Sequence, residues 1–283
     1  MKIGFYTPAY GVENDWFGCA TFGFSGQWDP LEPESISFSP QVNGDVICGT
    51  YEYCLENIPD KHYQAAIVLL GNGGRENWFI KALAAKINAP VVGGGAAIHP
   101  VSGQSAMITN SQEAAVYLIC DERYDFEVCC ENIHQTILGE HEIGLTHPRQ
   151  MDTIDGVDAA AWLAQKKESL GLSKDDFEHL TFSDLNGINA HLSLVDGKVC
   201  SGRDLTEKMV LRYVPADCVF ARMHDFYDDP SAIVFGCAGL KGILPKPIDT
   251  QGMGLFLFGE VCTKNGISEF GNLMLSKLRI IPK

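Results

Sequence analysis

The sequence lacks the features that usually mark secretion or membrane insertion. No apolar run reaches the ~18 residues that a membrane-spanning helix needs, and Met1 to Pro8 contain no apolar signal-peptide core. We therefore expect a cytoplasmic protein without a membrane partner. The ten cysteines are expected to be free thiols, because a reducing cytoplasm disfavours disulfides. Cys120 and Cys237 end apolar runs, where a thiol packs as a small hydrophobe.

The sequence also lacks the common nucleotide-binding and metal-binding motifs. It has no Gly-x-Gly-x-x-Gly, no Gly-Lys-Ser/Thr and no Cys-x-x-Cys. His134, His141 and His147 have a spacing that fits no zinc motif. The formal net charge of −15 repels the phosphates of nucleic acids. Neither a metal, a cofactor nor a nucleic acid is therefore expected.

One stretch of the chain has the pattern of a strand–helix–strand unit. Ala65–Leu70 is a continuous apolar run, which is typical of a strand buried on both faces. Residues 75–87 carry apolar side chains on one helical face, and Asn88 is a suitable end for that helix. Val91–Val92 starts a second strand, and Gly93–Gly95 is expected to mark its end. Ligands commonly bind at such strand ends.

The rest of the chain is dominated by strand patterns. Further strands are predicted at 105–109, 114–119, 126–130, 134–143, 152–157, 190–195, 199–201, 209–214, 231–237, 252–262 and 273–281. Two more helices are predicted, one capped by Asp158 and one starting at Ser173. Asp196-Gly197 predicts a hairpin turn, and Lys264-Asn265-Gly266 predicts another.

These patterns predict an α+β (mixed α/β) fold. The chain should form two subdomains, 1–155 and 156–283, whose sheets share a core with helices on the outside. Four layers, helix–sheet–sheet–helix, are the first arrangement expected. No low-complexity linker separates the two halves, so we expect them to pack tightly.

Several segments resemble the FIST domain family. Pro90–Ala97 resembles the Pro-Val-Val-Gly-Gly-Ser-Ala segment of the FIST N domain, and Met151–Ala160 resembles the strand–turn–helix segment that follows it. The strand ending at Cys237, the later Phe258-Gly259-Glu260 and the Phe270-Gly271-Asn272 turn resemble the FIST C domain. The resemblance covers roughly residues 65 to 283. Residues 1–60 match poorly.

The resemblance implies a sensory module that binds a small polar metabolite, such as an amino acid, between the two halves. It also implies a signal passed to a separate partner protein, since the family occurs with signalling output domains. The ligand would lie against one wall and face another. The expected ligand-binding residues are Gly93, Gly94, Gly95 and Ala96 on one side and Cys237, Lys241, Glu260 and Asn272 on the other.

Each of these residues also has a structural explanation. The glycines could serve close packing of strands, and Glu260 could form a salt bridge with Lys241 or Arg203. Cys237 is either a packed thiol or a nucleophile, and no catalytic residue is assigned. The competing functions are an enzyme that uses Cys237 or a Glu260/Lys241 pair, and a protein-interaction scaffold.

Overall fold

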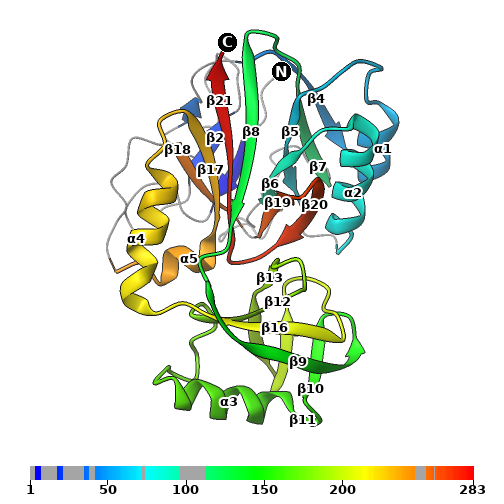
Figure 1. Ribbon diagram of the computed structural model, residues 1–283. Helices are drawn as coiled ribbons and strands as arrows, with labels where there is room; N and C mark the ends of the chain where they lie inside the picture. The colour runs from blue at the N-terminus through cyan, green and yellow to red at the C-terminus, as the bar shows by residue number, and fades with distance from the viewer. Residues whose placement is uncertain are drawn as a thin grey trace.

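The structure is a computed structural model that describes residues 4–7, 18–21, 35–37, 42–71, 74–95, 113–245, 253–257 and 259–283. The described part is α+β, as the sequence predicts, with more strand than helix (Figure 1). Two sheets pack against each other in the upper part of Figure 1, and a third, separate sheet lies below them. None of the described helices is long and apolar enough to cross a membrane.

The first of the two packed sheets has six strands in the order β20-β19-β6-β5-β7-β4. Its strands are β4 (Gly44–Gly49), β5 (Ala65–Leu70), β6 (Val91–Gly95), β7 (Ala114–Ile119), β19 (Glu260–Lys264) and β20 (Ile267–Gly271). Helices α1 (Tyr51–Glu56) and α2 (Glu76–Ile87) cover one face, where Phe79, Leu83 and Val68 share a buried cluster. The predicted strand–helix–strand unit is β5, α2 and β6.

The second packed sheet has four strands in the order β18-β17-β21-β8. Its strands are β8 (Tyr124–Glu131), β17 (Ala232–Cys237), β18 (Met253–Leu257) and β21 (Leu275–Pro282). Helices α4 (Ala216–Tyr227) and α5 (Ala238–Gly242) pack on its outer face. Strand β19 of the first sheet contacts β8 and β21 of the second. The order is therefore helix–sheet–sheet–helix, as expected.

The lower sheet is formed by one continuous segment, residues 136–213. Its strands are β9 (Thr136–His147), β10 (Gln150–Ile154), β11 (Val157–Asp158), β12 (Leu180–Ser183), β13 (Asn189–Ala190), β14 (Leu192–Val195), β15 (Lys198–Ser201) and β16 (Lys208–Tyr213). Helix α3 (Ala159–Ser169) packs on it (Figure 1). We call this segment the inserted body. A further small sheet contains β1 (Gly4–Thr7), β2 (Gly18–Thr21) and β3 (Ser35–Ser37).

The sheets do not divide the chain after residue 155. That position lies in the turn between β10 and β11, which pair with each other in the inserted body. The two packed sheets instead combine early and late segments of the chain. Strand β6 pairs with β19, and β8 pairs with β21 along eight residue pairs. These long-range pairings join the parts that the sequence pattern separated.

Local signals in the sequence give the expected ends and turns. Asn88 ends α2 in the left-handed conformation, at φ +49°. The side chain of Asp158 accepts a hydrogen bond from the amide of Ala161 at 2.9 Å and so caps α3. Asp196 and Gly197 both have positive φ between β14 and β15, as a tight hairpin turn requires.

Some expectations were wrong. The segment that starts at Ser173 forms turns and no helix, and α1 and α4 form where no helix was predicted. Strand β6 runs through Gly95, so the glycines lie within the strand and do not follow it. The single strand predicted over 252–262 is two strands, β18 and β19, which belong to different sheets. The predicted strand at 105–109 lies outside the described residues.

The expectation that every cysteine is a free thiol was also wrong. Cys130 of β8 and Cys262 of β19 form a disulfide that links the two packed sheets. Cys129 and Cys130 are neighbours on one strand and point to opposite faces, so only Cys130 faces the other sheet. Cys120 and Cys237 are free thiols, as expected.

The glycines of β6 provide a test of the sheet packing. A Cβ at Gly93 would lie 1.9 Å from the carbonyl oxygen of Val68, and its φ of +121° disfavours any side chain. We expect Gly93→Ala to lower the free energy of unfolding by about 3 kcal/mol or more in denaturant titrations. Gly242→Ala is the control, since a Cβ there meets no atom within 4 Å. Equal stabilities of the two variants would contradict this packing.

Candidate functional site

The predicted glycine wall and the predicted Glu260 strand meet directly. Gly94 is the register partner of Glu260, and the amide of Gly95 donates to the carbonyl oxygen of Gly259 at 3.0 Å. A Cβ at Gly94 would lie 2.1 Å from that same oxygen. The sequence predicts that a ligand separates these segments, yet in the structure they are neighbouring strands. Close packing of the backbone accounts for Gly93 and Gly94, and their contact with a ligand stays a prediction.

Glu260 lies where the chain crosses from one sheet to the other. Strand β18 ends at Leu257 in the four-stranded sheet, and β19 starts at Glu260 in the six-stranded sheet. Gly259 makes the crossing with φ +82°. The parallel strands β17 and β18 end here, and so does β6. Carboxyl ends of parallel strands at such a change of sheet are common ligand sites in α/β proteins.

The carboxyl group of Glu260 is completely buried. Its Oε2 accepts a hydrogen bond from the amide of Met274 at 3.0 Å. Its Oε1 accepts no hydrogen bond of ordinary geometry from the described residues. Burial raises the pKa of Glu260 well above its usual value, against smaller lowering effects of the Met274 amide and the Cys237 thiol. Burial therefore favours the protonated, neutral form of this carboxyl group.

Cys237 lies beside this carboxyl group at the end of β17. Its thiol interacts with Glu260, and the backbone amides of Leu273, Gly239 and Gly259 have small lowering effects on its pKa. Leu273 has φ +54°, a strained conformation for a non-glycine residue. Burial nevertheless dominates and raises the pKa of Cys237, so the sulfur is held as a thiol.

Tyr227 adds a third titratable side chain, which the sequence pattern does not predict. Tyr227 ends α4 and is almost completely buried. Burial raises the pKa of Tyr227, and ionisation of Glu260 or Cys237 would raise it further. Val219, Met223 and Phe226 have helical spacing along one face, which is the signal that could have revealed α4.

Asn272 attaches the crossing to the inserted body. Its backbone amide donates to the carbonyl oxygen of Asn189 at 3.0 Å, and its Oδ1 accepts from the amide of His191 at 3.3 Å. Its side chain also lies beside Gly259, because a Cβ there would be 2.8 Å from its Nδ2. Asn272, a predicted ligand contact, is thus close to Glu260. It also links the packed sheets to the inserted body.

A polar seam of Asn132, His134, Asn189 and Leu273 continues this link. The side-chain amide of Asn189 lies 3.2 Å from His134 Nδ1 and 3.2 Å from the carbonyl oxygen of Leu273. Asn132 pairs with the Asn189 amide at 2.7 and 3.0 Å. His134 Nε2 lies 2.6 Å from the carbonyl oxygen of Glu178. Burial lowers the pKa of His134 to about 4, so its ring is neutral.

The other predicted site residues have different positions. Arg203, a possible partner of Glu260, pairs with Asp184 at 3.1 Å. Lys241 belongs to α5, but its side chain lies outside the described part, as does Ala96. The described residues contain no cluster of three or more His, Cys, Asp or Glu side chains that could hold a metal ion. The structure therefore brings together Gly94, Gly95, Cys237, Glu260 and Asn272.

Comparison of the chain with models of known protein families finds no match, and a search of curated proteins finds none either.

Titration of Glu260 should make stability depend on pH. Its folded pKa lies above the unfolded value near 4.5, so the unfolded chain releases its proton first as pH rises. The contribution of Glu260 to the free energy of unfolding is therefore fully present below the unfolded pKa. It is lost as pH rises towards the folded pKa. We expect Glu260→Gln to remove a slope of up to about 1.4 kcal/mol per pH unit in denaturant titrations. Exposed Glu140→Gln should keep the slope. An unchanged slope in Glu260→Gln would contradict a buried neutral carboxyl.

His134 should have the opposite effect. Its folded pKa of about 4 lies below the unfolded 6.5, so its contribution is present above pH 6.5 and is lost as pH falls towards 4. We expect His134→Gln to be less stable at neutral pH but to lack this loss, measured as unfolding free energy between pH 7 and 4. His62→Gln, on the exposed surface, is the matched control. If both variants lose stability equally over this range, His134 is not the responsible group.

Proposed function

We propose that the protein is a sensory module that binds a small polar metabolite beside Glu260. The observation that carries this proposal is the completely buried carboxyl whose Oε1 accepts no ordinary hydrogen bond from the described residues. A buried polar atom without a partner costs about 1–3 kcal/mol. Native proteins retain such groups mainly at functional sites or where water or a ligand supplies the partner.

The chemistry of the group indicates what the ligand must supply. Oε1 can accept a hydrogen bond, and a Cβ at Gly94 or Gly259 would already lie within 3 Å of neighbouring atoms, which disfavours a bulky group. A small ligand with an amine or hydroxyl group meets both conditions. An ammonium group would also lower the pKa of Glu260, because an opposite charge favours the ionised carboxylate. An amino acid belongs to this class.

The resemblance to the FIST domain family supports the same proposal. The segments that carry it include Gly93–Gly95, Cys237, Glu260 and Asn272, and these meet at the sheet crossing. The signal would pass through the polar seam, because Asn272 lies beside the crossing and its amide donates to Asn189 of that seam, in the inserted body. A ligand that favours one arrangement of this seam shifts the population of states, and a partner protein can bind that state.

The enzyme alternative has less support. A cysteine nucleophile reacts as a thiolate, and burial raises the pKa of Cys237. The Glu260/Lys241 pair involves a side chain outside the described residues. We also propose a cytoplasmic location, in which Cys120 and Cys237 stay reduced and the Cys130–Cys262 bond is protected between two sheets.

A thermal-shift screen tests the proposal. The panel consists of the twenty standard amino acids, putrescine and small dicarboxylates. A ligand that binds the native state raises the melting temperature, by roughly 2–4 °C for each kcal/mol of stabilisation in a domain of this size. We expect at least one amine-containing compound to do so, and we expect Glu260→Gln to lose the shift. Glu140→Gln should retain it.

Two results would reject this assignment. Either no compound of the panel stabilises the wild-type protein, or every active compound stabilises Glu260→Gln to the same extent. Glu260→Gln is expected to fold, because glutamine has nearly the shape of the neutral acid and can still accept from Met274.

A further inference from the structure

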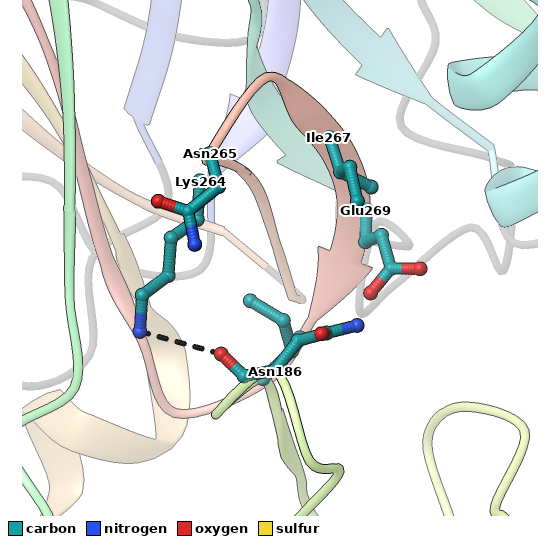
Figure 2. A pocket seen from close by; sticks show the side chains of 6 residues that line it. Asn186, Lys264, Asn265, Ile267 and Glu269 are labelled. Carbon is teal, nitrogen blue, oxygen red and sulfur yellow. Dashed lines mark hydrogen bonds between the residues drawn. The ribbon is translucent and has the colours of Figure 1, made fainter.

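A pocket lies at the contact between the inserted body and the hairpin β19–β20 (Figure 2). Its empty space is about 280 Å³ when the open solvent at its mouth is included. Its lining residues come from the loop between β12 and β13 and from the hairpin, namely Asn186, Ile188, Lys264, Asn265, Ile267 and Glu269. The hairpin side chains of Lys264, Ile267 and Glu269 share one face of the sheet, because Lys264 pairs with Ile267 and Cys262 pairs with Glu269.

Glu269 supplies a buried acceptor to this pocket. Only 8% of the residue is exposed, and its Oε1 forms an ion pair with Lys81 of α2 at 2.6 Å. Its Oε2 is buried and has no hydrogen-bond partner among the described residues. A carboxylate oxygen in this state requires a donor from a water molecule or a ligand. The ion pair with Lys81 leaves that requirement unmet.

Lys264 supplies a positive charge on the opposite side. Its Nζ donates to the backbone oxygen of Asn186 at 3.3 Å, as Figure 2 shows, and this uses one of its three N–H groups in the described contacts. Figure 2 also shows the Glu269 carboxyl on the other side of the pocket from the Lys264 ammonium. Ile188 and Ile267 add apolar surface to the lining.

We propose that this pocket binds a short-chain carboxylate that also carries a hydrogen-bond donor, the chemistry shared by small α-hydroxy and α-amino acids. The ligand carboxylate faces Lys264, its hydroxyl or ammonium donates to Oε2 of Glu269, and its short carbon chain lies on Ile188 and Ile267. Both polar groups of such a ligand have a partner, and charge-assisted hydrogen bonds are the stronger kind. Because residues of both the inserted body and the hairpin line the pocket, its ligand also stabilises the contact between them.

Methyl NMR of the full chain tests this pocket directly. The isoleucine δ1 methyl groups are labelled, and the signals of Ile188 and Ile267 are assigned with Ile188→Val and Ile267→Val. The probes are lactate, with a hydroxyl donor, alanine, with an ammonium donor, and propionate, with neither. We expect lactate, alanine or both to shift these two signals saturably, and propionate to bind at least about tenfold more weakly.

Variants separate the pocket from general charge effects. Glu269→Gln and Lys264→Met should each weaken the shift at least about tenfold. Lys81→Met removes only the outer ion pair of Glu269 and should retain binding. Lys198→Met is the control for Lys264, because it also flanks a two-residue hairpin turn but lies outside the pocket.

The proposal is overturned if neither lactate nor alanine shifts the two methyl signals saturably. It is also overturned if propionate binds as well as they do, or if Glu269→Gln binds like the wild-type protein. Lys264 is exposed, so Lys264→Met keeps the test valid even if Glu269→Gln fails to fold.

Discussion

The backbones of Gly94 and Gly259 are in close contact, and this contact determines how β6 and β19 pair. Gly95 donates to the oxygen of Gly259, and no residue with a Cβ fits at Gly94 without displacing that oxygen. This contact makes β6 and β19 neighbours, so early and late parts of the chain form one sheet. The disulfide between Cys130 and Cys262 then joins that sheet to the second. The inserted body contacts the packed sheets at Asn272, whose Oδ1 accepts a hydrogen bond from the amide of His191.

The same contact determines the environment of Glu260. A carboxyl on the first residue after the crossing lies between two packed sheets and loses contact with water. A purely structural carboxyl in a core would be expected to have both oxygens hydrogen-bonded or to be paired with a cation. Arg203 instead pairs with Asp184, and Oε1 of Glu260 is left without a described hydrogen bond. This unpartnered oxygen supports the proposal that a small donor binds beside Glu260.

The parts of the fold that could be predicted from the sequence depend on local chemistry. Asn88, Asp158 and the Asp196-Gly197 turn act on their own neighbours, so their effects follow from the residue type and its position. The division of 252–262 into two strands and the Cys130–Cys262 bond depend on partners far away in the sequence. The pocket at Glu269 could not be predicted for the same reason, because its lining residues come from the inserted body and from the hairpin β19–β20. The proximity of Gly94, Cys237, Glu260 and Asn272 could be predicted, because the resemblance to a known family combines distant segments.

The sheet crossing should hold Glu260 as a buried neutral acid. The most direct test is a pH titration of the glutamate side-chain carboxyl carbons by ¹³C NMR, with the Glu260 signal identified by its absence in Glu260→Gln. We expect this signal to keep the chemical shift of a protonated acid at pH values where the exposed glutamates are ionised. A Glu260 signal that titrates together with the exposed glutamates would contradict it.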